Sequence, residues 1–272
     1  MMPAPQRRLA YLVAGVFLLP GAALYLFPER AADDFSWPIT PFVAMTMGSW
    51  FLGGAYVAWR AARLGAWWIA YPGLLFLGLF GLLELVVVLL HRDEATFTGF
   101  LPTVYFLAIL AALLAGTAWL SAWGKDRGSE TPAGDPAPVW MRILVAGFLL
   151  FAAYIGIRLL LGTSRGGEVW PGRLSLVTAR SFGAFYTALA LTVIPLLWSR
   201  SFRPILALLP PAAVGSVLIT VPAFVYFEQF DFEVQPGGRV YIGTYLFVLV
   251  AASVILLRNR LREEAPAGSR NA

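Results

Sequence analysis

Long apolar runs separated by short polar stretches dominate this chain of 272 residues. A helix needs about 20 apolar residues to cross the roughly 30 Å hydrocarbon core of a bilayer. Runs of this length are expected to be helices rather than strands, because lipid offers no partner for unpaired backbone groups. We therefore expect an all-α integral membrane protein with eight transmembrane helices, over approximately residues 8–27, 41–60, 66–90, 100–123, 139–161, 174–198, 203–227 and 240–257.

Two copies of one short pattern indicate an internal duplication. Both copies open with Trp-Pro, at Trp37-Pro38 and at Trp170-Pro171. After two extra residues in the second copy, a stretch of six residues matches in residue class and has an identical glycine, Gly48 in the first copy and Gly183 in the second. The chain is therefore interpreted as two related halves.

Weaker matches extend this duplication along both halves. Residues 12–15 align with residues 144–147, and residues 103–105 align less closely with residues 243–245. Each half holds four predicted spans, and because four is an even number, the second half enters the membrane in the same direction as the first. We expect two parallel four-helix repeats, related by an axis along the membrane normal.

A polar stretch rich in Gly and Pro separates the two halves and predicts a flexible linker. The expected division is residues 1–123 for the first repeat, 124–138 for a cytoplasmic linker, 139–258 for the second repeat and 259–272 for a cytoplasmic tail.

Charged residues are few and unevenly placed. Only 13% of the residues are charged and 59% are hydrophobic, which leaves too little polar surface for a water-soluble globule of this length. Lys and Arg gather at the N-terminus, near Arg60 and Arg63, in the linker and beyond Arg258, whereas the opposite loops hold clustered acids. The positive-inside rule then predicts a multi-pass protein of the cell membrane with both termini in the cytoplasm. The net charge of +5 includes no basic run of five residues, so we expect no nucleic-acid partner.

The absence of Cys and the presence of a single His exclude several kinds of site. Thiolate chemistry needs Cys, and bis-imidazole haem or two-histidine zinc sites need more than one His. Residues 162–166 match the letters Gly-x-Ser-x-Gly of a nucleophile elbow, but an elbow needs a strand before it and a helix straight after it. A loop turn is the preferred interpretation there, and the only Lys, Lys125, lies in the linker. We expect no cofactor, no metal and no enzymatic activity.

Three charged side chains lie well inside the predicted spans: Glu84, Arg158 and Arg180. A charge in the middle of a bilayer costs about 2.5 to 3.5 kcal/mol even on a lenient scale, so such residues need partners or mark a site. Arg158 is expected to extend to the outer headgroups.

Glu84 and Arg180 each lie about seven residues from the outer end of a span, roughly 10 Å deep at 1.5 Å per residue. We predict that these two form an ion pair that docks one repeat on the other. The alternative is a polar site for an anionic or protonatable ligand.

The residues of the repeated motif have structural interpretations with functional alternatives. Trp37-Pro38 and Trp170-Pro171 are expected to anchor the outer membrane interface and to start the second and sixth helices, rather than to stack on a ligand. Gly48 and Gly183 are typical of close helix packing, with an apolar cavity wall as the alternative.

The outer loops contain the remaining candidates. His91 is expected to be a solvated loop residue, and Phe227–Val234 an extended strip on the outer surface. The clustered acids are interpreted as an acidic face, with a Ca²⁺ or Mg²⁺ site as the alternative, although no ligand-loop spacing is present. These acids include Asp33, Asp34, Asp93 and Glu94.

The stretch from Phe35 to Pro41, followed by the small-residue helix through Gly48 and Gly54, resembles a pattern of uncharacterised bacterial multi-pass membrane proteins. Residues 176–184 resemble its companion in the same proteins. The resemblance implies a membrane location and no particular activity.

Two functional classes follow from this reading. We expect a non-enzymatic accessory or scaffolding protein, because packing alone requires only small and apolar residues. The alternative is a transporter, or a membrane protein that binds a small ligand or lipid at a site between the two repeats. The expected partners are the lipid bilayer and other membrane subunits.

Overall fold

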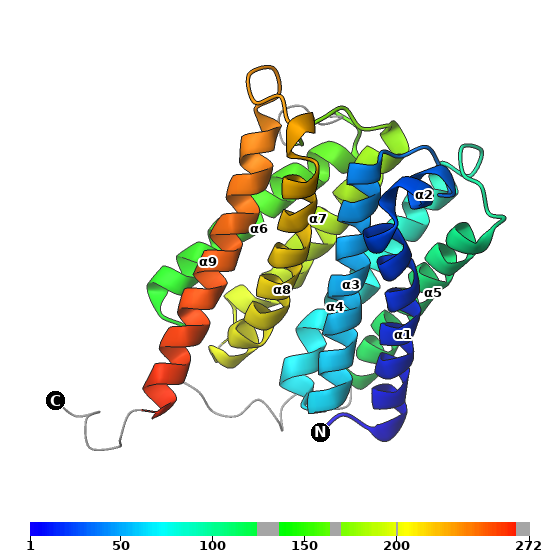
Figure 1. Ribbon diagram of the computed structural model, residues 1–272. Helices are drawn as coiled ribbons and strands as arrows, with labels where there is room; N and C mark the ends of the chain where they lie inside the picture. The colour runs from blue at the N-terminus through cyan, green and yellow to red at the C-terminus, as the bar shows by residue number, and fades with distance from the viewer. Residues whose placement is uncertain (124–135, 164–169, 200, 265–272) are drawn as a thin grey trace.

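The computed structural model describes residues 1–123, 136–163, 170–199 and 201–264, and the elements formed by these residues are helices. Figure 1 shows the long helices lying side by side in one bundle. The elements are α1 (Ala4–Leu26), α2 (Pro28–Asp33), α3 (Pro41–Leu64), α4 (Trp67–Leu90), α5 (Phe100–Trp123), α6 (Val139–Leu160), α7 (Leu176–Leu197), α8 (Arg203–Val225), the 3₁₀-helix η1 (Phe227–Gln229) and α9 (Gly237–Glu264). The all-helical prediction is confirmed.

Seven of these helices are long and apolar enough to cross a membrane: α1, α4, α5, α6, α7, α8 and α9. The chain is therefore a multi-pass membrane protein. The other long helix, α3, has 24 residues but a less apolar sequence with Gly, Ser, Thr and Arg. It packs against α1, α2, α4 and α8. Because α3 faces protein on most sides, it does not need the continuous apolar surface that lipid-facing helices present.

Most helix boundaries lie close to the predicted spans, and two segments differ. The helix α9 continues to Glu264, beyond the expected end of the second repeat at residue 258. The segment Phe227–Val234 is not an extended strip, because it contains η1 and a turn. Asp231 makes this turn, since its Oδ1 accepts hydrogen bonds from the backbone N–H groups of Glu233 and Val234, both at 3.1 Å. Most of the linker expected at residues 124–138 lies outside the described residues.

Side-chain caps, and not the Trp-Pro pairs, start the two helices of the repeated motif. The Thr40 hydroxyl accepts from Val43 N at the start of α3, and the Ser175 hydroxyl accepts from Thr178 N at the start of α7. Such caps satisfy backbone donors that a helix leaves unpaired in its first turn. Pro38 and Pro171 precede these helices and are not part of their first turns.

The helices of each half pack as neighbouring pairs, and three pairs among the described elements join the halves. Within the halves, α1 packs on α3, α4 on α5, α6 on α7, and α8 on α9. Between the halves, α4 packs on α7 and on α8, and α3 packs on α8. The first half is closed further by contacts of α1 with α5 and of α3 with α4, whereas α6 and α9 do not pack extensively on each other. The second half is therefore the more open one.

The two glycines of the repeated motif allow a close approach of neighbouring helices. A Cβ atom at Gly48 would lie 2.7 Å from the backbone N of Tyr25 in α1, and one at Gly183 would lie 2.7 Å from the Cα of Leu160 in α6. Real Cβ atoms essentially never come this close to another atom. Any larger residue at either position would force two helix backbones apart.

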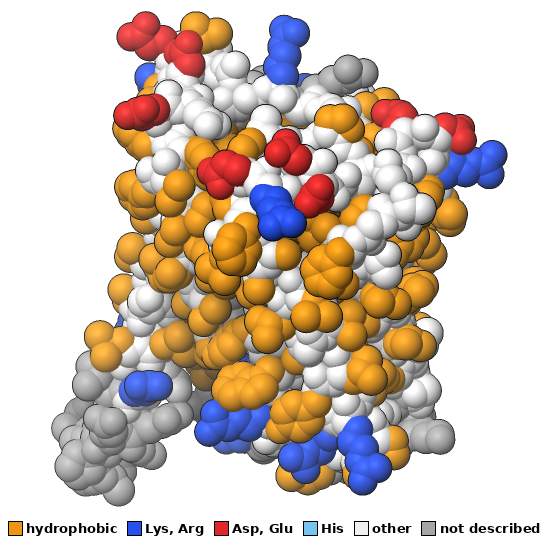
Figure 2. Space-filling view, turned by 45° about the vertical axis from the view of Figure 1, so that its right-hand side comes forward, with side chains coloured by type: hydrophobic (Ala, Val, Ile, Leu, Met, Phe, Trp, Pro, Cys, Tyr) orange, Lys and Arg blue, Asp and Glu red, His pale blue; other side chains and the backbone are white. Residues whose placement is uncertain are grey.

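The two ends of the bundle differ in charge. Figure 2 shows acidic side chains gathered toward one end and most of the visible Lys and Arg side chains at the other. The first turn of α1 and the last described turn of α9 both lie at the basic end (Figure 1). The acidic end is called the outer end below, following the charge rule used above.

Candidate functional site

Both tryptophans of the repeated motif are buried inside the protein. Trp37 and Trp170 are each 3% exposed, so neither side chain faces the lipid headgroups. The expectation that they anchor the membrane interface is wrong. Trp37 lies in a cluster with Phe35 and Tyr105, with ring centroids 4.7 and 5.6 Å away. The connections before α3 and α7 thus fold back over the outer end of the bundle, which the apolar pattern alone does not reveal.

Each tryptophan also contacts the first turn of the motif helix in the other half. The Nε1–H group of Trp37 donates a hydrogen bond of 3.0 Å to the Thr178 hydroxyl in α7. The Trp170 ring stacks on Phe42 in α3, with centroids 5.2 Å apart and planes inclined by 28°. The two connections therefore cross over and tie the halves together at the outer end.

Glu84, in α4, is a carboxyl group enclosed by protein. It is 1% exposed. Its Oε1 accepts a hydrogen bond from the hydroxyl of Tyr105 in α5, whereas its Oε2 has no hydrogen-bond partner among the described residues. The hydroxyl of Ser181, in α7, lies beside both groups and likewise lacks a partner in hydrogen-bond geometry. The cluster holds one acid and two hydroxyls and no cationic partner.

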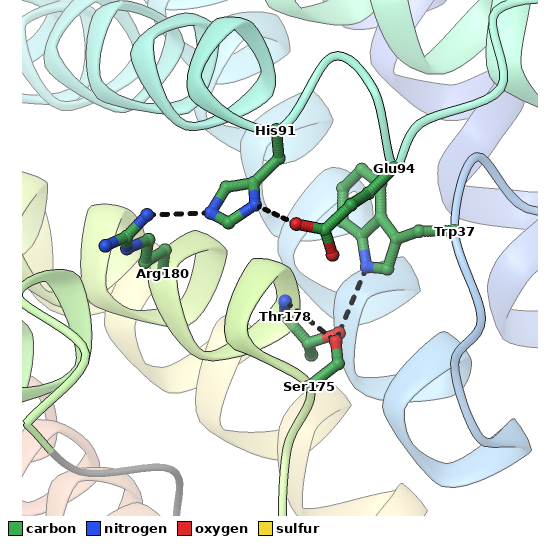
Figure 3. Close-up of polar contacts among 6 residues, drawn as sticks. All are labelled: Trp37, His91, Glu94, Ser175, Thr178 and Arg180. Atoms are coloured by element: carbon green, nitrogen blue, oxygen red, sulfur yellow. Dashed lines mark hydrogen bonds and ion pairs between the residues drawn. The ribbon is translucent and has the colours of Figure 1, made fainter.

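Arg180 contacts His91 instead of Glu84 (Figure 3). Arg180 Nη1 lies 2.9 Å from His91 Nε2, and His91 Nδ1 lies 2.8 Å from Glu94 Oε1. A guanidinium group only donates hydrogen bonds, so Nε2 accepts and the imidazole is neutral with its proton on Nδ1, directed at Glu94. His91 is 5% exposed and is thus a buried bridge between α4 and α7, not a solvated loop residue.

The predicted ion pair between Glu84 and Arg180 does not form among the described residues, and helix geometry gives the reason. The helix α7 starts at Leu176, so Arg180 lies about 6 Å along its axis from the outer end at 1.5 Å per residue. Glu84 lies about 9 Å from the end of α4 by the same measure. Arg180 is therefore nearer the surface, at the level of His91, and the adjacent Ser181 faces the carboxyl group.

A row of hydroxyl groups runs along one face of α7 from its outer end toward Glu84. It consists of Ser175, Thr178 and Ser181, which are spaced three residues apart and therefore share a face. Ser175 is exposed, Thr178 is 2% exposed and Ser181 is fully buried. The hydroxyl oxygens of Ser175 and Thr178 lie 2.8 Å apart (Figure 3). The row thus joins the outer surface to the level of the buried carboxyl group.

A separate apolar cavity of about 290 Å³ lies between the two halves of the chain. Residues of α3, α4, α6, α7, α8 and α9 line it, and none of them is charged. Its polar lining groups are largely engaged within the protein: the hydroxyls of Tyr186 and Tyr245 bond each other at 2.5 Å, and that of Thr192 donates to Ala188 O at 2.8 Å. The walls offer a molecule mainly hydrocarbon and aromatic surface.

The cavity reaches the outside of the bundle between α6 and α9. Two of its lining residues are exposed on the surface, Leu144 of α6 and Phe247 of α9, at 39% and 61%. These two helices do not pack extensively on each other. Because this surface lies within the spans, the opening faces the hydrocarbon core and not water.

Other candidates from the sequence take different places. Arg158 donates a hydrogen bond of 2.7 Å to the hydroxyl of Tyr154, one turn earlier in α6. The Gly-x-Ser-x-Gly match at residues 162–166 extends outside the described residues. Among the described residues, no three His, Asp or Glu side chains are arranged to hold a metal ion, so the acidic loops show no cation site.

One ionisable contact at the outer end lies outside the spans. The hydroxyl of Tyr226, just after α8, donates a hydrogen bond of 2.9 Å to Glu29 in α2. Burial, this hydrogen bond and the nearby carboxylate charge together raise the pKa of Tyr226 to about 12. The contact links α2 to the end of α8.

Sequence reasoning missed the hydroxyl row and the role of His91, and it gave an apolar cavity and a site between the repeats only as alternatives, without the residues that line the cavity. The spacing of Ser175, Thr178 and Ser181 was a signal for the row, because three hydroxyls on one face of an apolar helix are visible in the sequence. The cavity had no such signal, because its lining residues are the same apolar types that fill a packed core.

A bundle of apolar helices enclosing a polar cluster and a lipid-facing cavity defines a polytopic α-helical membrane protein. Comparison of the chain with known protein families, curated proteins and solved structures finds no match.

Proposed function

We propose that the protein is an eight-span protein of the cell membrane that holds a hydrophobic, lipid-like molecule in the cavity between its halves. The observation that carries this proposal is the uncharged cavity that opens toward the hydrocarbon core between α6 and α9. Its volume, about 290 Å³, is at the lower limit of ligand pockets, which span about 300 to 1,000 Å³. A single acyl chain or a molecule of similar size and polarity fits this description.

The number of spans supports this topology. In this proposal α3 is the eighth span, because it is as long as α4 and α5 and lies among the other spans. Eight spans return the chain to the side on which it started, in agreement with Figure 1, where the first turn of α1 and the last described turn of α9 lie at the same end of the bundle. The basic end is then the cytoplasmic face.

Reciprocal contacts support the descent of the two halves from one repeat. A Cβ atom at Gly48 would meet Gly21 O of α1, and one at Gly183 would meet Gly156 O of α6. Gly21 and Gly156 are each 27 residues before the motif glycine, so the same pair of positions makes the same close approach twice. The resemblance of this motif to bacterial membrane proteins supports a bacterial cell membrane as the location.

A reciprocal tyrosine contact extends this correspondence. Tyr105 bonds Glu84 and lies beside Ser181, while Tyr241 bonds Ile219 O at 3.1 Å and lies 3.4 Å from the hydroxyl of Thr46. Thr46 and Ser181 are equivalent in the motif alignment. The tyrosine that corresponds to Tyr105 is thus Tyr241, and not Tyr245 as the sequence alignment indicated.

An accessory role without a bound ligand is the second candidate, favoured by the absence of any charged group in the cavity lining. It predicts that lipids enter the cavity without preference and that filling the cavity has no effect on a partner protein. In both candidates the protein is not an enzyme.

The cavity proposal is tested with a photoreactive fatty acid added to the purified protein in lipid nanodiscs, with the labelled residues mapped by mass spectrometry. The variant Gly215→Leu fills the cavity, because Gly215 lines it and a Cβ atom there meets nothing within 4 Å. The matched control is Gly147→Leu, since Gly147 is exposed on α6, has equally open surroundings and does not line the cavity.

We expect labelling of Phe148 and Phe247 in the wild type and in Gly147→Leu, and a loss of about tenfold in Gly215→Leu, equivalent to about 1.4 kcal/mol of binding free energy. Equal labelling of these residues in both variants would contradict a bound molecule and favour the accessory role.

A further inference from the structure

We propose that Glu84 is a proton-binding site that exchanges its proton with the outer side through the hydroxyls of Ser181, Thr178 and Ser175. The inference is independent of the cavity and of any molecule bound there. It assigns a function to the one acidic side chain that the described bundle encloses completely.

The surroundings of Glu84 favour a neutral carboxylic acid. The group is 1% exposed, and the described residues place no cation within ion-pair distance of it. An ionised carboxylate without a partner in such a place loses several kcal/mol of hydration free energy. The Oε1 atom accepts from Tyr105, as the carbonyl oxygen of an acid does, and Oε2 is left without a partner. A proton on Glu84 Oε2 that is donated to Ser181 Oγ would give a hydrogen bond to both of these atoms, which otherwise have none.

The described ionisable groups on the neighbouring helices do not provide a positive charge that would stabilise Glu84 as a carboxylate. The helix α5 contributes Tyr105, and α7 contributes Arg180, which contacts His91 and forms no ion pair with Glu84. The ionisable residues of α3 and α8 lie toward the inner ends of these helices. At 1.5 Å per residue, Arg60 and Arg203 are about 28 and 33 Å from the outer ends of their helices, whereas Glu84 is about 9 Å from the outer end of α4. Among the described residues, these arginines are therefore about four turns of helix too deep to pair with the carboxyl group.

The hydroxyl row supplies a route for the proton. On release, Oε2 of Glu84 gives its proton to Ser181 Oγ, which passes its own hydroxyl proton toward Thr178, and Thr178 does the same toward Ser175 and bulk water. The products are a carboxylate and one proton in water, and loading is the reverse. Ser175 and Thr178 are already 2.8 Å apart. Helix residues three apart have Cβ atoms roughly 5 to 6 Å apart, a span that one bridging water closes between Thr178 and Ser181.

The test is infrared spectroscopy of the full-length protein in lipid nanodiscs at neutral pH. A protonated carboxyl group has a C=O stretch that is distinct from the carboxylate bands and shifts when D₂O replaces H₂O. We expect such a band in the wild type, its loss in Glu84→Gln, and its retention in Glu94→Gln, where the carboxyl group is 60% exposed. Absence of the band in the wild type would overturn the proposal, and so would its persistence in Glu84→Gln.

The route is tested by the rate at which the band shifts after rapid mixing with D₂O. We expect Ser181→Ala and Thr178→Val to slow exchange by about tenfold or more, and Thr178→Ser to restore it. Thr192→Val is the matched control, because Thr192 is a buried hydroxyl of the same helix that lies off the row and bonds Ala188 O. If Thr192→Val slows exchange as much as the row variants, or if no variant does, the proton reaches Glu84 by another path.

Discussion

Replacing Gly183 by Ala tests the close approach of α6 and α7. The added Cβ atom would lie 2.7 Å from Leu160 Cα and 2.9 Å from Gly156 O, which are backbone atoms that no side-chain rotation can move. Overpacking of this kind costs about 1 to 3 kcal/mol. The exchange of Gly for Ala in a helix recovers about 0.5 to 1 kcal/mol of that loss. We therefore expect a net destabilisation of up to about 2.5 kcal/mol, and a stability about 1 to 3 kcal/mol below that of the same substitution at a glycine with open surroundings.

The assay is equilibrium unfolding in mixed micelles with increasing denaturing detergent, followed by circular dichroism. Gly147→Ala is the control, because a Cβ atom there meets nothing within 4 Å, and it should gain up to about 1 kcal/mol from helix propensity alone. Gly48→Ala should fall between the two, since its Cβ would lie 2.7 Å from Tyr25 N, 3.0 Å from Leu24 C and 3.1 Å from Gly21 O, whereas the Cβ at residue 183 would come closer than any of these to Leu160 N. If Gly183→Ala is as stable as Gly147→Ala, the helices are not in the contact described and the packing argument fails.

Two further predictions concern the outer end. The cysteine of Asp93→Cys, at a position where the native side chain is 94% exposed, should react with an impermeant thiol reagent in intact cells. The cysteine of Arg8→Cys, also at an exposed position, should react only after the cells are opened. The reverse pattern would show that the topology is inverted. Because the pKa of Tyr226 is raised to about 12, its contact with Glu29 should stabilise the folded protein below about pH 10, the ordinary pKa of Tyr. That stabilisation should disappear as the pH rises toward 12. Tyr226→Phe should remove tyrosinate absorbance that appears above about pH 11 and leave the absorbance that appears below about pH 10 unchanged; a loss below about pH 10 would refute the assignment.

The sequence was sufficient to locate the helices because the length of an apolar run is set by the thickness of the bilayer. The predicted span 100–123 coincides with α5, and 66–90 differs from α4 by one residue at its start. The direction in which each residue points was not predictable in the same way. The helix α4 is apolar on every side, so no periodic pattern indicates which neighbour Glu84 faces.

The failed pairing of Glu84 with Arg180 has the same origin. The place of a side chain on a helix is set by its depth along the helix axis and by its direction around that axis. The sequence indicated an approximate depth and no direction. Arg180 and Ser181 are adjacent in sequence but point about 100° apart on a helix with 3.6 residues per turn. The structure directs Ser181 to the carboxyl group and Arg180 to His91, which itself depends on the fold of the connection after α4. Neither rotation nor loop conformation could be obtained from hydropathy.

The two halves, if they are repeats as proposed, have diverged toward different tasks. In the first half Tyr105 bonds the carboxyl group of Glu84, whereas at the corresponding place in the second half Tyr241 bonds the backbone oxygen of Ile219 and lies 3.4 Å from the hydroxyl of Thr46, with no described acid beside it. The first half is closed by contacts between α1 and α5, while the second half has no comparable contact between α6 and α9, where the cavity between the halves opens. A duplication that needed only to pack would retain equivalent contacts in both halves. Among the described residues, the acid has no counterpart in the second half, and the cavity opens between α6 and α9, the pair of helices without close contact. A purely structural role leaves both features unexplained, whereas a proton site and a hydrophobic binding site together explain them.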